Sequence, residues 1–234
     1  MCGRFTISFV IGLSERFQAR IPSFDLIPRY NIAPSQEVPV VVRAHPDGAE
    51  NEIRMMRWGL VPSWAKDPSR SPKPINARAE TLFEKPMFRE LLQKRRCLVP
   101  ATGFFEWKKE AWGRTPYYIR MSDNSLFAFA GLFDTHRPPD GEEISTFSII
   151  TTEPNSVVSP YHDRMPAILK AEDEERWRSP GMLCSYEVSD LLQSYPASRM
   201  EAYPVGKKVN TTNAEGEELI RPVRSLYDRS WGGT

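Results

Sequence analysis

The sequence has no long hydrophobic run and few cysteines, and each lack excludes a class of protein. A transmembrane helix needs about 20 consecutive apolar residues, and no segment approaches that length. Phe5 to Leu13 is only mildly apolar and has no small-residue cleavage site after it, so we expect no signal peptide. The three cysteines are scattered and odd in number, which argues against a disulfide framework. We therefore expect a cytoplasmic protein in a reducing compartment.

The sequence also lacks an excess of charge and the common metal and phosphate motifs. Its formal net charge is +1, so any site for a polyanion must be a local basic patch. It has no Cys-x-x-Cys pair, and His45, His136 and His162 lie far apart, which argues against structural zinc. It has no glycine-rich phosphate loop and no Gly-x-Ser-x-Gly elbow. We therefore expect no metal and no cofactor.

What the sequence does have is the composition of an ordinary soluble protein, with many prolines along the chain. Hydrophobic residues make up 40% of the chain and charged residues 26%, as in globular domains. The 21 prolines are spread along the chain and favour many short elements over a helical bundle. We predict an α+β fold with a strongly bent mixed sheet or barrel-like core and peripheral helices. It forms one domain over residues 1–223, followed by a loose tail over 224–234.

Residue patterns place the expected elements along the chain. Strands do not alternate regularly with helices, which argues against a doubly wound fold. The strands at 38–43 and 52–58 should form a hairpin around the turn at 46–48. Apolar spacing predicts helices at 11–21, 86–96, 171–178 and 188–194. Further strands are expected at 97–100, 104–108, 116–121, 126–133, 144–152, 164–169 and 201–205.

The most informative residue is Cys2. A small residue after the initiator methionine is the usual signal for removal of Met1, which would leave Cys2 at the amino terminus. A terminal cysteine carries an α-amine and a thiol on adjacent carbons. The amine can condense with an aldehyde, and the thiol can then close a five-membered thiazolidine ring. The amine titrates near pH ~8 and the thiol near ~8.5. Taken alone, Cys2 is more simply a terminal residue with no role.

Two segments place polar groups among apolar neighbours. If residues 74–80 are extended, Asn76 and Arg78 project to the same side. There an amide can orient an amine or thiol and an arginine can bind a phosphate. The alternative is a loop asparagine with a surface arginine. Glu106 lies within the aromatic stretch 103–107, where burial would raise its pKa and poise it for proton transfer. An edge strand would instead leave it in water.

A third segment offers a proton donor. His162 lies in a crowded turn between two expected strands, beside Asp163 and Arg164. Histidine is the general acid or base available near neutral pH. A lone histidine is nevertheless more often structural than catalytic.

A fourth segment offers a basic aromatic surface. Residues 57–66 interleave tryptophan with basic side chains, a pattern that suits single-stranded nucleic acid, since bases stack on rings and cations meet phosphates. Trp64 and Lys66 would belong to that surface, and Arg4 could extend it. Trp58 is better explained as a core residue.

Several stretches of the sequence, taken together, carry a resemblance. They follow one another through most of the chain as MCGRF (1–5), RYNIAPSQ (29–36), WGLVPSWAKD (58–67), INARAETL (75–82), RRCLVPATGFFEW (95–107), FSIITTEPN (147–155) and HDRMPAIL (162–169). In order and spacing these stretches resemble the SOS-response-associated peptidase family, or SRAP domain. The chain departs from the family pattern at Thr102 and Phe105, where Asp and Tyr are common. It departs again at Tyr161, where an aliphatic residue is frequent. These departures concern pocket shape rather than reacting groups.

The resemblance implies a sensor of abasic sites in single-stranded DNA. Family members form a covalent DNA–protein cross-link through the terminal cysteine, which protects the lesion, and are described as peptidases that remove their own initiator methionine. Carried over by position, the catalytic residues are Cys2, Asn76, Glu106 and His162. The DNA contacts are Arg4 and Arg78 from the family pattern, with Trp64 and Lys66 from the basic aromatic stretch.

The expected mechanism starts when the abasic sugar opens to its aldehyde with a proton from His162. The Cys2 amine, held by Asn76 and Glu106, forms an imine while Glu106 shuttles the proton. The thiol then closes the thiazolidine. We expect a monomer whose partners are abasic single-stranded DNA and the replication machinery, associated with the nucleoid when it acts on DNA.

Two other functions stay open from the sequence. The first is a cysteine peptidase in which His162 activates Cys2 to act on the chain itself or on other proteins. The second is a non-covalent reader of modified bases, which needs Trp64 and the basic stretch but no free Cys2.

Overall fold

A closed ring of strands lies at the centre of the molecule. The computed structural model describes residues 2–45, 48–111, 113–138 and 141–223. Around the ring, the order is β5–β4–β7–β10–β11. The parallel pairing of β11 with β5 closes the ring, whereas the other pairs are antiparallel. The ring strands are β4 (Glu37–Arg43), β5 (Asn51–Trp58), β7 (Arg96–Ala101), β10 (Phe127–His136) and β11 (Ile144–Thr152).

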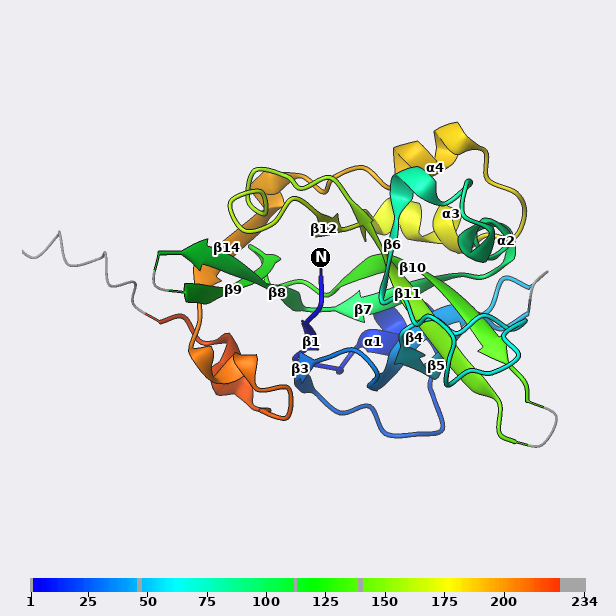
Figure 1. Ribbon diagram of the computed structural model, residues 1–234, viewed down its shortest axis with the longest axis horizontal. Coiled ribbons are helices and arrows are strands. Elements are labelled where there is room, and N and C mark those ends of the chain that lie inside the picture. The colour runs from blue at the N-terminus through cyan, green and yellow to red at the C-terminus, as the bar shows by residue number, and fades with distance from the viewer. Residues whose placement is uncertain (1, 46–47, 112, 139–140, 224–234) are drawn as a thin grey trace, which may run out of the picture.

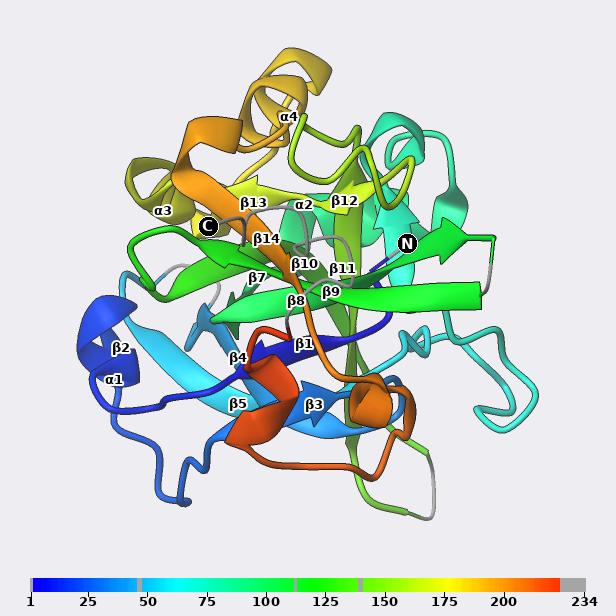
Figure 2. The ribbon, with the colours of Figure 1, turned by 90° about the vertical axis from the view of Figure 1, so that its left-hand side faces the viewer.

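A second, antiparallel sheet lies beside the barrel, as Figure 2 shows. Its order is β14–β9–β8–β1–β3. Thr102 alone separates β7 from β8, so the chain passes directly from the barrel into this sheet. Its strands are β1 (Phe5–Ile7), β3 (Arg29–Ile32), β8 (Gly103–Glu110), β9 (Gly113–Met121) and β14 (Met200–Pro204).

Four short strands extend the barrel sheet. The pairing of β6 and β12 with β11 brings both against the end of that strand, where Thr151 lies opposite both Arg78 and Pro166. The other two pair with β5 and β10. The bounds are β2 (Ala19–Arg20), β6 (Asn76–Arg78), β12 (Met165–Pro166) and β13 (Ile168–Leu169). The end of β11 is thus a junction of segments from distant parts of the sequence.

Helices lie at the periphery, with α2, α3 and α4 gathered on one side of the strands (Figures 1 and 2). Pro86 begins α2, and the helix buries Phe88, Leu91 and Leu92. The helices are α1 (Leu13–Arg16), α2 (Pro86–Lys94), α3 (Glu174–Arg178) and α4 (Ser185–Leu191). The 3₁₀ helices are η1 (Ala79–Thr81), η2 (Ala171–Asp173), η3 (Ala197–Arg199), η4 (Lys207–Asn210) and η5 (Glu217–Ile220). No described helix is long and apolar enough to cross a membrane.

Aromatic rings join the two sheets. Phe5 of β1 makes edge contacts with Trp58, at a centroid distance of 5.2 Å, and with Phe129, at 5.7 Å. Trp58 also stacks on Phe147 at 6.4 Å. All four rings are buried. Each such ring buries a large apolar area, so β1 is anchored to the barrel a few residues after Cys2.

A buried hydroxyl network holds β1 against β8. The Thr6 hydroxyl lies 2.8 Å from both the Thr102 hydroxyl and the Tyr118 hydroxyl. A Cβ on Gly103 would lie 2.3 Å from Tyr118 ring atoms, closer than real contacts allow. Gly103 is therefore required for the approach of Tyr118, and the network fixes the strand that leads to Glu106.

The α+β class with a bent, barrel-like mixed sheet is confirmed. The 38–43 and 52–58 hairpin pairs as predicted, although its turn at 46–47 lies outside the described residues. The helix expected at 86–96 is also present but ends at Lys94, and Arg96 begins β7. The tail from 224 to 234 likewise lies outside the described residues.

Other predicted elements also differ in extent, among them the helix at 171–178, whose first three residues form η2 before α3 begins at Glu174. The helix at 11–21 is only Leu13–Arg16, because Gln18 adopts a positive φ of 48° and β2 follows. The helix at 188–194 begins earlier, at Ser185, where the Cys184 backbone N–H donates to Glu187. The strand at 164–169 is interrupted at Ala167, whose N–H donates to β11 and whose carbonyl accepts from β10. The strand thus changes partner there.

Candidate functional site

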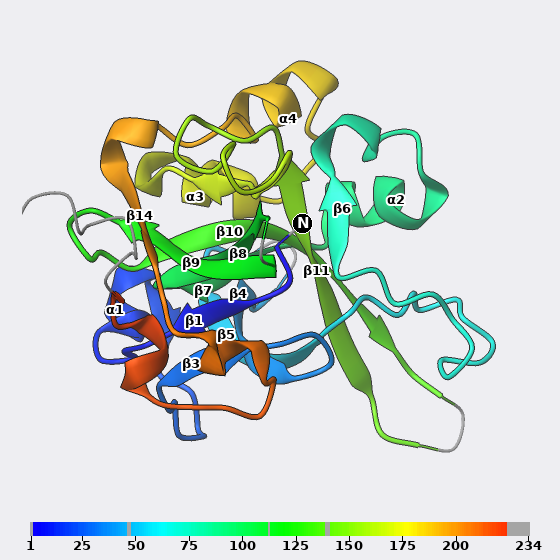
Figure 3. The same ribbon diagram turned by 60° about the vertical axis from the view of Figure 1, so that its left-hand side comes forward.

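The start of the chain lies beside the strand that carries Glu106. Phe5 pairs with Phe104 in antiparallel register, and the Phe105 N–H donates to the Arg4 carbonyl at 2.9 Å. Figure 3 shows the chain before β1 rising toward β6 and β11. Cys2 is fully buried there, and burial raises the pKa of its thiol far above the usual range, with the Glu106 charge as a further cause. The thiol is therefore protonated near neutral pH.

Asn76 holds the backbone of Cys2. It begins β6, which lies parallel to β11 with Asn76 opposite Ile149. Its side-chain Nδ2 donates to the Cys2 carbonyl at 2.9 Å. Its Oδ1 is buried and accepts no hydrogen bond from any described residue. A buried acceptor without a partner is costly, so this amide presents an oxygen suited to an incoming N–H.

Glu106 lies in β8 between the buried Phe105 and the half-buried Trp107 and is only 4% exposed. Burial raises the pKa of its carboxyl to about 7. The negative charge of Asp163 acts in the same direction, whereas a hydrogen bond from the Trp107 backbone opposes it. A carboxyl with this pKa exchanges its proton readily at neutral pH.

His162 lies on the loop between β11 and β12. Burial lowers the pKa of its imidazole, so the ring is mostly neutral near pH 7. Its Nδ1 accepts the Arg164 backbone N–H at 3.0 Å and also lies 2.7 Å from the Asp163 carboxylate. Nδ1 must be without a proton to accept from Arg164, but it must carry a proton to bind Asp163. The backbone donor is fixed whereas Asp163 is exposed, so we assign the neutral ring its proton on Nε2.

A cavity of about 650 Å³ brings Glu106 and His162 to one opening. Trp107, Lys109 and Tyr161 line it as well. Tyr161 lies against Tyr117 with ring centroids 4.4 Å apart, which makes one wall aromatic. Among the described residues, no group of three or more His, Cys, Asp or Glu side chains could hold a metal ion. The cavity therefore offers proton-exchanging groups, a lysine and a flat apolar surface.

Arg4, a predicted DNA contact, points into the protein, and its binding of DNA stays a prediction. It is 9% exposed, and its Nη1 donates to Asn31 at 2.7 Å and to the Val209 carbonyl at 2.8 Å. Its guanidinium also lies over the Trp107 ring. These contacts turn Arg4 inward, where it braces the chain start against β3 and η4.

The other predicted DNA contacts lie on the surface. Arg78, at the end of β6, is exposed, as is Lys66. Trp64 is 67% exposed, whereas Trp58 is fully buried, as predicted for a core residue. Arg78 is two residues from Asn76, so it shares the short strand that holds Cys2. Binding of DNA by Arg78, Trp64 and Lys66 stays a prediction.

The sequence analysis missed a clamp between two parts of the site. Arg164 donates to both carboxylate oxygens of Glu80, at 2.7 and 2.9 Å, and to the Thr151 carbonyl at 2.5 Å. Bidentate pairs of this kind fix orientation as well as distance. The clamp joins the loop of His162 to the segment of Asn76. Only the adjacency of Arg164 to His162 could have indicated it, because Glu80 is 84 positions away.

Asn155 shapes the start of the histidine loop. Its Oδ1 accepts the backbone N–H groups of Val157 and Val158, at 3.0 and 3.1 Å. Its Nδ2 donates to the Tyr195 carbonyl at 2.7 Å. Such side-chain turns restrain a loop without regular secondary structure. The loop that carries His162 is therefore held at its start by Asn155 and at its end by the Glu80–Arg164 clamp.

The fold and site together define a class of protein, in which an amide holds a cysteine at the chain start beside a barrel, within the electrostatic influence of a buried acid. The sequence profile of the family described as SOS response associated peptidase (SRAP) matches residues 1–212. The chain belongs to this family.

Known relatives cover nearly the whole chain. It is 43% identical over 224 residues to the abasic site processing protein YoqW of Bacillus subtilis, covering 94% of this chain and 99% of that protein. It is 34% identical over 225 residues to the abasic site processing protein HMCES of Gallus gallus, covering 84% and 66%. A crystal structure of a Bacteroides thetaiotaomicron protein superposes with a TM-score of 0.82 at 31% identity, covering 95% and 100%.

Proposed function

We propose that this protein processes abasic sites in single-stranded DNA by forming a covalent cross-link through Cys2 after Met1 is removed. The observation that carries the proposal is the hydrogen bond from Asn76 to the Cys2 carbonyl, next to a buried Asn76 oxygen without a described partner. The names of the relatives support the same lesion as substrate. The DNA damage response is the setting in which such a protein acts.

The amine of the processed Cys2 reacts first. It attacks the open aldehyde of the sugar and releases water, which leaves an imine. The buried thiol is protonated, so it is a poor competitor for the aldehyde. It then adds across the imine: sulfur bonds to carbon and nitrogen gains a proton, which closes the thiazolidine. Asn76 orients the amine, and a positioned pair of reactants can lower the barrier by several kcal/mol, roughly 7–11 at best.

Glu106 and His162 divide the proton transfers. With a pKa of about 7, Glu106 takes a proton from the attacking amine and returns it when water leaves. The neutral His162 presents Nε2–H to the sugar oxygen and polarises it as the ring opens. This differs from a charged imidazolium, because burial lowers the pKa of His162.

DNA is held by groups on the protein surface. Arg78 contacts a phosphate, Trp64 provides a stacking surface, and Lys66 adds charge beside it. Arg4 braces the chain start against β3 and η4. The protein acts as a monomer at the nucleoid in the cytoplasm, alongside the replication machinery.

The test uses an abasic oligonucleotide on a denaturing gel, with intact mass. Wild-type protein is expected to give an adduct equal to the Met1-less chain plus DNA minus one water. Cys2→Ala should give no stable adduct. Cys184→Ala, which removes an exposed cysteine elsewhere, should behave as wild type.

Four outcomes would contradict the proposal. A stable adduct of normal yield from Cys2→Ala would refute ring closure. A shift that appears only in native gels would favour the non-covalent reader. Active protein that retains Met1 would exclude the terminal amine, and turnover of added peptides would favour the peptidase.

A further inference from the structure

A second cavity, of about 370 Å³, lies among the ends of α2 and α3 and strands β4, β5 and β7. Figure 1 shows α2 and α3 on the right of the molecule, with β9 and β14 on the left. The lining of this second cavity shares no residue with the lining of the cavity of Glu106 and His162. Six of its lining side chains are cationic and none is a carboxylate: Arg43, Arg54, Lys94, Arg95, Arg96 and Arg178.

Arg96 is a buried cation that forms no salt bridge with a described carboxylate, although the charge of Glu187 acts on it at longer range. It is 6% exposed, and its guanidinium donates only to backbone carbonyls, those of Leu92, Trp177, Ser179 and Gly181. Carbonyls orient a guanidinium but do not neutralise it. A buried charge that is compensated mainly by carbonyl dipoles is costly, so an anion closer than Glu187 would stabilise this arrangement.

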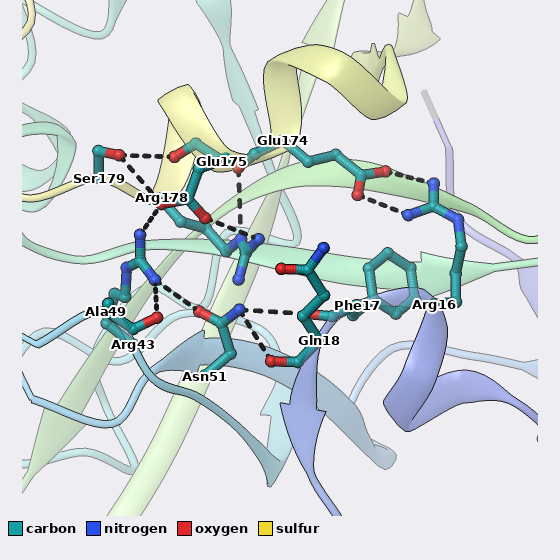
Figure 4. Close-up of polar contacts among 10 residues, drawn as sticks. All are labelled: Arg16, Phe17, Gln18, Arg43, Ala49, Asn51, Glu174, Glu175, Arg178 and Ser179. Carbon is teal, nitrogen blue, oxygen red and sulfur yellow. Dashed lines mark hydrogen bonds and ion pairs between the residues drawn. The ribbon is translucent and has the colours of Figure 1, made fainter.

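Arg43 and Arg178 share one acid. Figure 4 shows the Glu175 carboxylate between their two guanidinium groups. Arg178 is 7% exposed, and its Nη1 has no partner among the described residues; the same holds for Nε of Arg43. The Glu175 side chain is 58% exposed, so this carboxylate can swing away. It occupies the position that a soluble anion would take between the two arginines.

The rim of this cavity adds a flat surface. The Arg95 guanidinium lies over the Phe133 ring, 5.5 Å from its centroid, and both residues line the cavity. Among the described residues, Arg54 pairs with the half-buried Glu52 and Lys94 with the exposed Glu90. Counting Glu52, Glu90 and Glu175 against the six cations, the lining keeps a net positive charge.

We infer that this cavity binds the phosphate group of a nucleotide. The volume lies in the usual range for small-molecule sites, about 300–1,000 Å³. Arginine forks bind phosphate oxygens in pairs, and the Arg95–Phe133 surface suits a stacked base. The phosphate comes either from a free nucleotide or from a strand passing far from the lesion. This inference does not depend on the chemistry of Cys2.

The test measures binding by calorimetry with three probes: pyrophosphate, deoxyadenosine monophosphate, and an oligothymidylate without abasic sites. Arg54→Gln/Arg95→Gln removes two rim cations and should weaken binding about tenfold or more. Arg89→Gln is the matched control, because Arg89 is an exposed arginine of α2 that does not line the cavity. Glu175→Gln should have the opposite effect and tighten binding, because it removes the competing carboxylate, whereas the exposed Glu172→Gln should change nothing.

The outcomes separate the sources of phosphate. If the variants change the affinity for deoxyadenosine monophosphate as expected, the phosphate comes from a free nucleotide. If they change the affinity for the oligothymidylate alone, it comes from a DNA strand. If none of the probes distinguishes the variants from wild type, or Glu175→Gln weakens binding, the inference is overturned. Thermal unfolding of each variant checks that the fold is kept. Cross-linking at Cys2 should be unaffected by Arg54→Gln/Arg95→Gln on a short abasic oligonucleotide.

Discussion

At the scale of single residues, burial controls the chemistry of the site. It keeps the Cys2 thiol protonated, brings the pKa of Glu106 to about 7 and holds His162 mostly neutral. In water the Glu106 carboxyl would be ionised at neutral pH, and the Cys2 thiol and the His162 imidazole would reach their charged forms more readily. The sequence could suggest the buried Glu106, because aromatic residues flank it. It could not show that Arg4 turns inward, because the acceptors, Asn31 and the Val209 carbonyl, are distant in sequence.

Glu106 should make the stability of the fold depend on pH. Its folded-state pKa of about 7 lies above the ordinary value of 4.5. The folded protein therefore holds this proton more tightly than the unfolded chain, so the contribution is full below about pH 4.5 and is lost as pH rises through 7. Glu106→Gln stays neutral throughout. Wild type should lose about 1 to 3 kcal/mol relative to this variant between pH 5 and 8, measured by urea unfolding.

The exposed Glu84→Gln is the control for this comparison. It should follow the wild-type pH dependence. If Glu106→Gln and wild type lose stability in parallel across this range, the carboxyl does not carry a raised pKa in the folded protein.

At the scale of elements, the site depends on segments that meet only in three dimensions. The β4–β5 hairpin and α2 were predictable, because their turn residues and apolar spacing are local. The three-residue strands β1 and β6 give no such periodicity, although they place Cys2 and Asn76. The resemblance identified Asn76 as a site residue. The Glu80–Arg164 clamp has no local signal, because neither residue stands out from other charged residues in the sequence.

The clamp gives a prediction about elements moving together. Glu80→Gln removes the bidentate pairing of Arg164 and should let the histidine loop shift relative to β6. Cross-linking should slow about tenfold, because small misplacements of reacting groups are costly in rate. Stability should change by less than about 1 kcal/mol, since the Glu80 side chain is 48% exposed. Single-turnover cross-linking and urea unfolding measure the two effects.

Glu84→Gln is again the matched control, because it lies one turn beyond Glu80 and outside the clamp. Equal rates for Glu80→Gln and Glu84→Gln would show that the clamp does not position the site. A loss of stability as large as the loss of rate would assign Glu80 a structural role instead.

At the scale of the whole molecule, closure of the barrel and placement of the site are the same event. The pairing of β5 with β11 puts Trp58 opposite Phe147, and the Gly59 N–H then donates to the Phe147 carbonyl at 2.9 Å. The Trp58 indole N–H donates to the Ile75 carbonyl at 2.8 Å, one residue before Asn76. Trp58 thereby fixes two strands of the site: β1 through its contact with Phe5, and β6 through its hydrogen bond to Ile75. The parallel pairing of β5 with β11 could not be predicted from local sequence patterns, because the two strands are distant in sequence. The bent sheet itself was predicted.

Trp58→Phe tests whether closure positions the site. It keeps an aromatic ring against Phe147 but removes the hydrogen bond to Ile75 and leaves a small void, so unfolding should require about 2–3 kcal/mol less. Cross-linking should slow under conditions where the variant is fully folded, because the segment before Asn76 loses its tie to the barrel. Trp64→Phe makes the same chemical change at an exposed position and should alter stability by no more than about 0.5 kcal/mol. Urea unfolding and cross-linking rates of the two variants decide the matter: similar stability losses, or an unchanged rate for Trp58→Phe, would show that the site is placed independently of barrel closure.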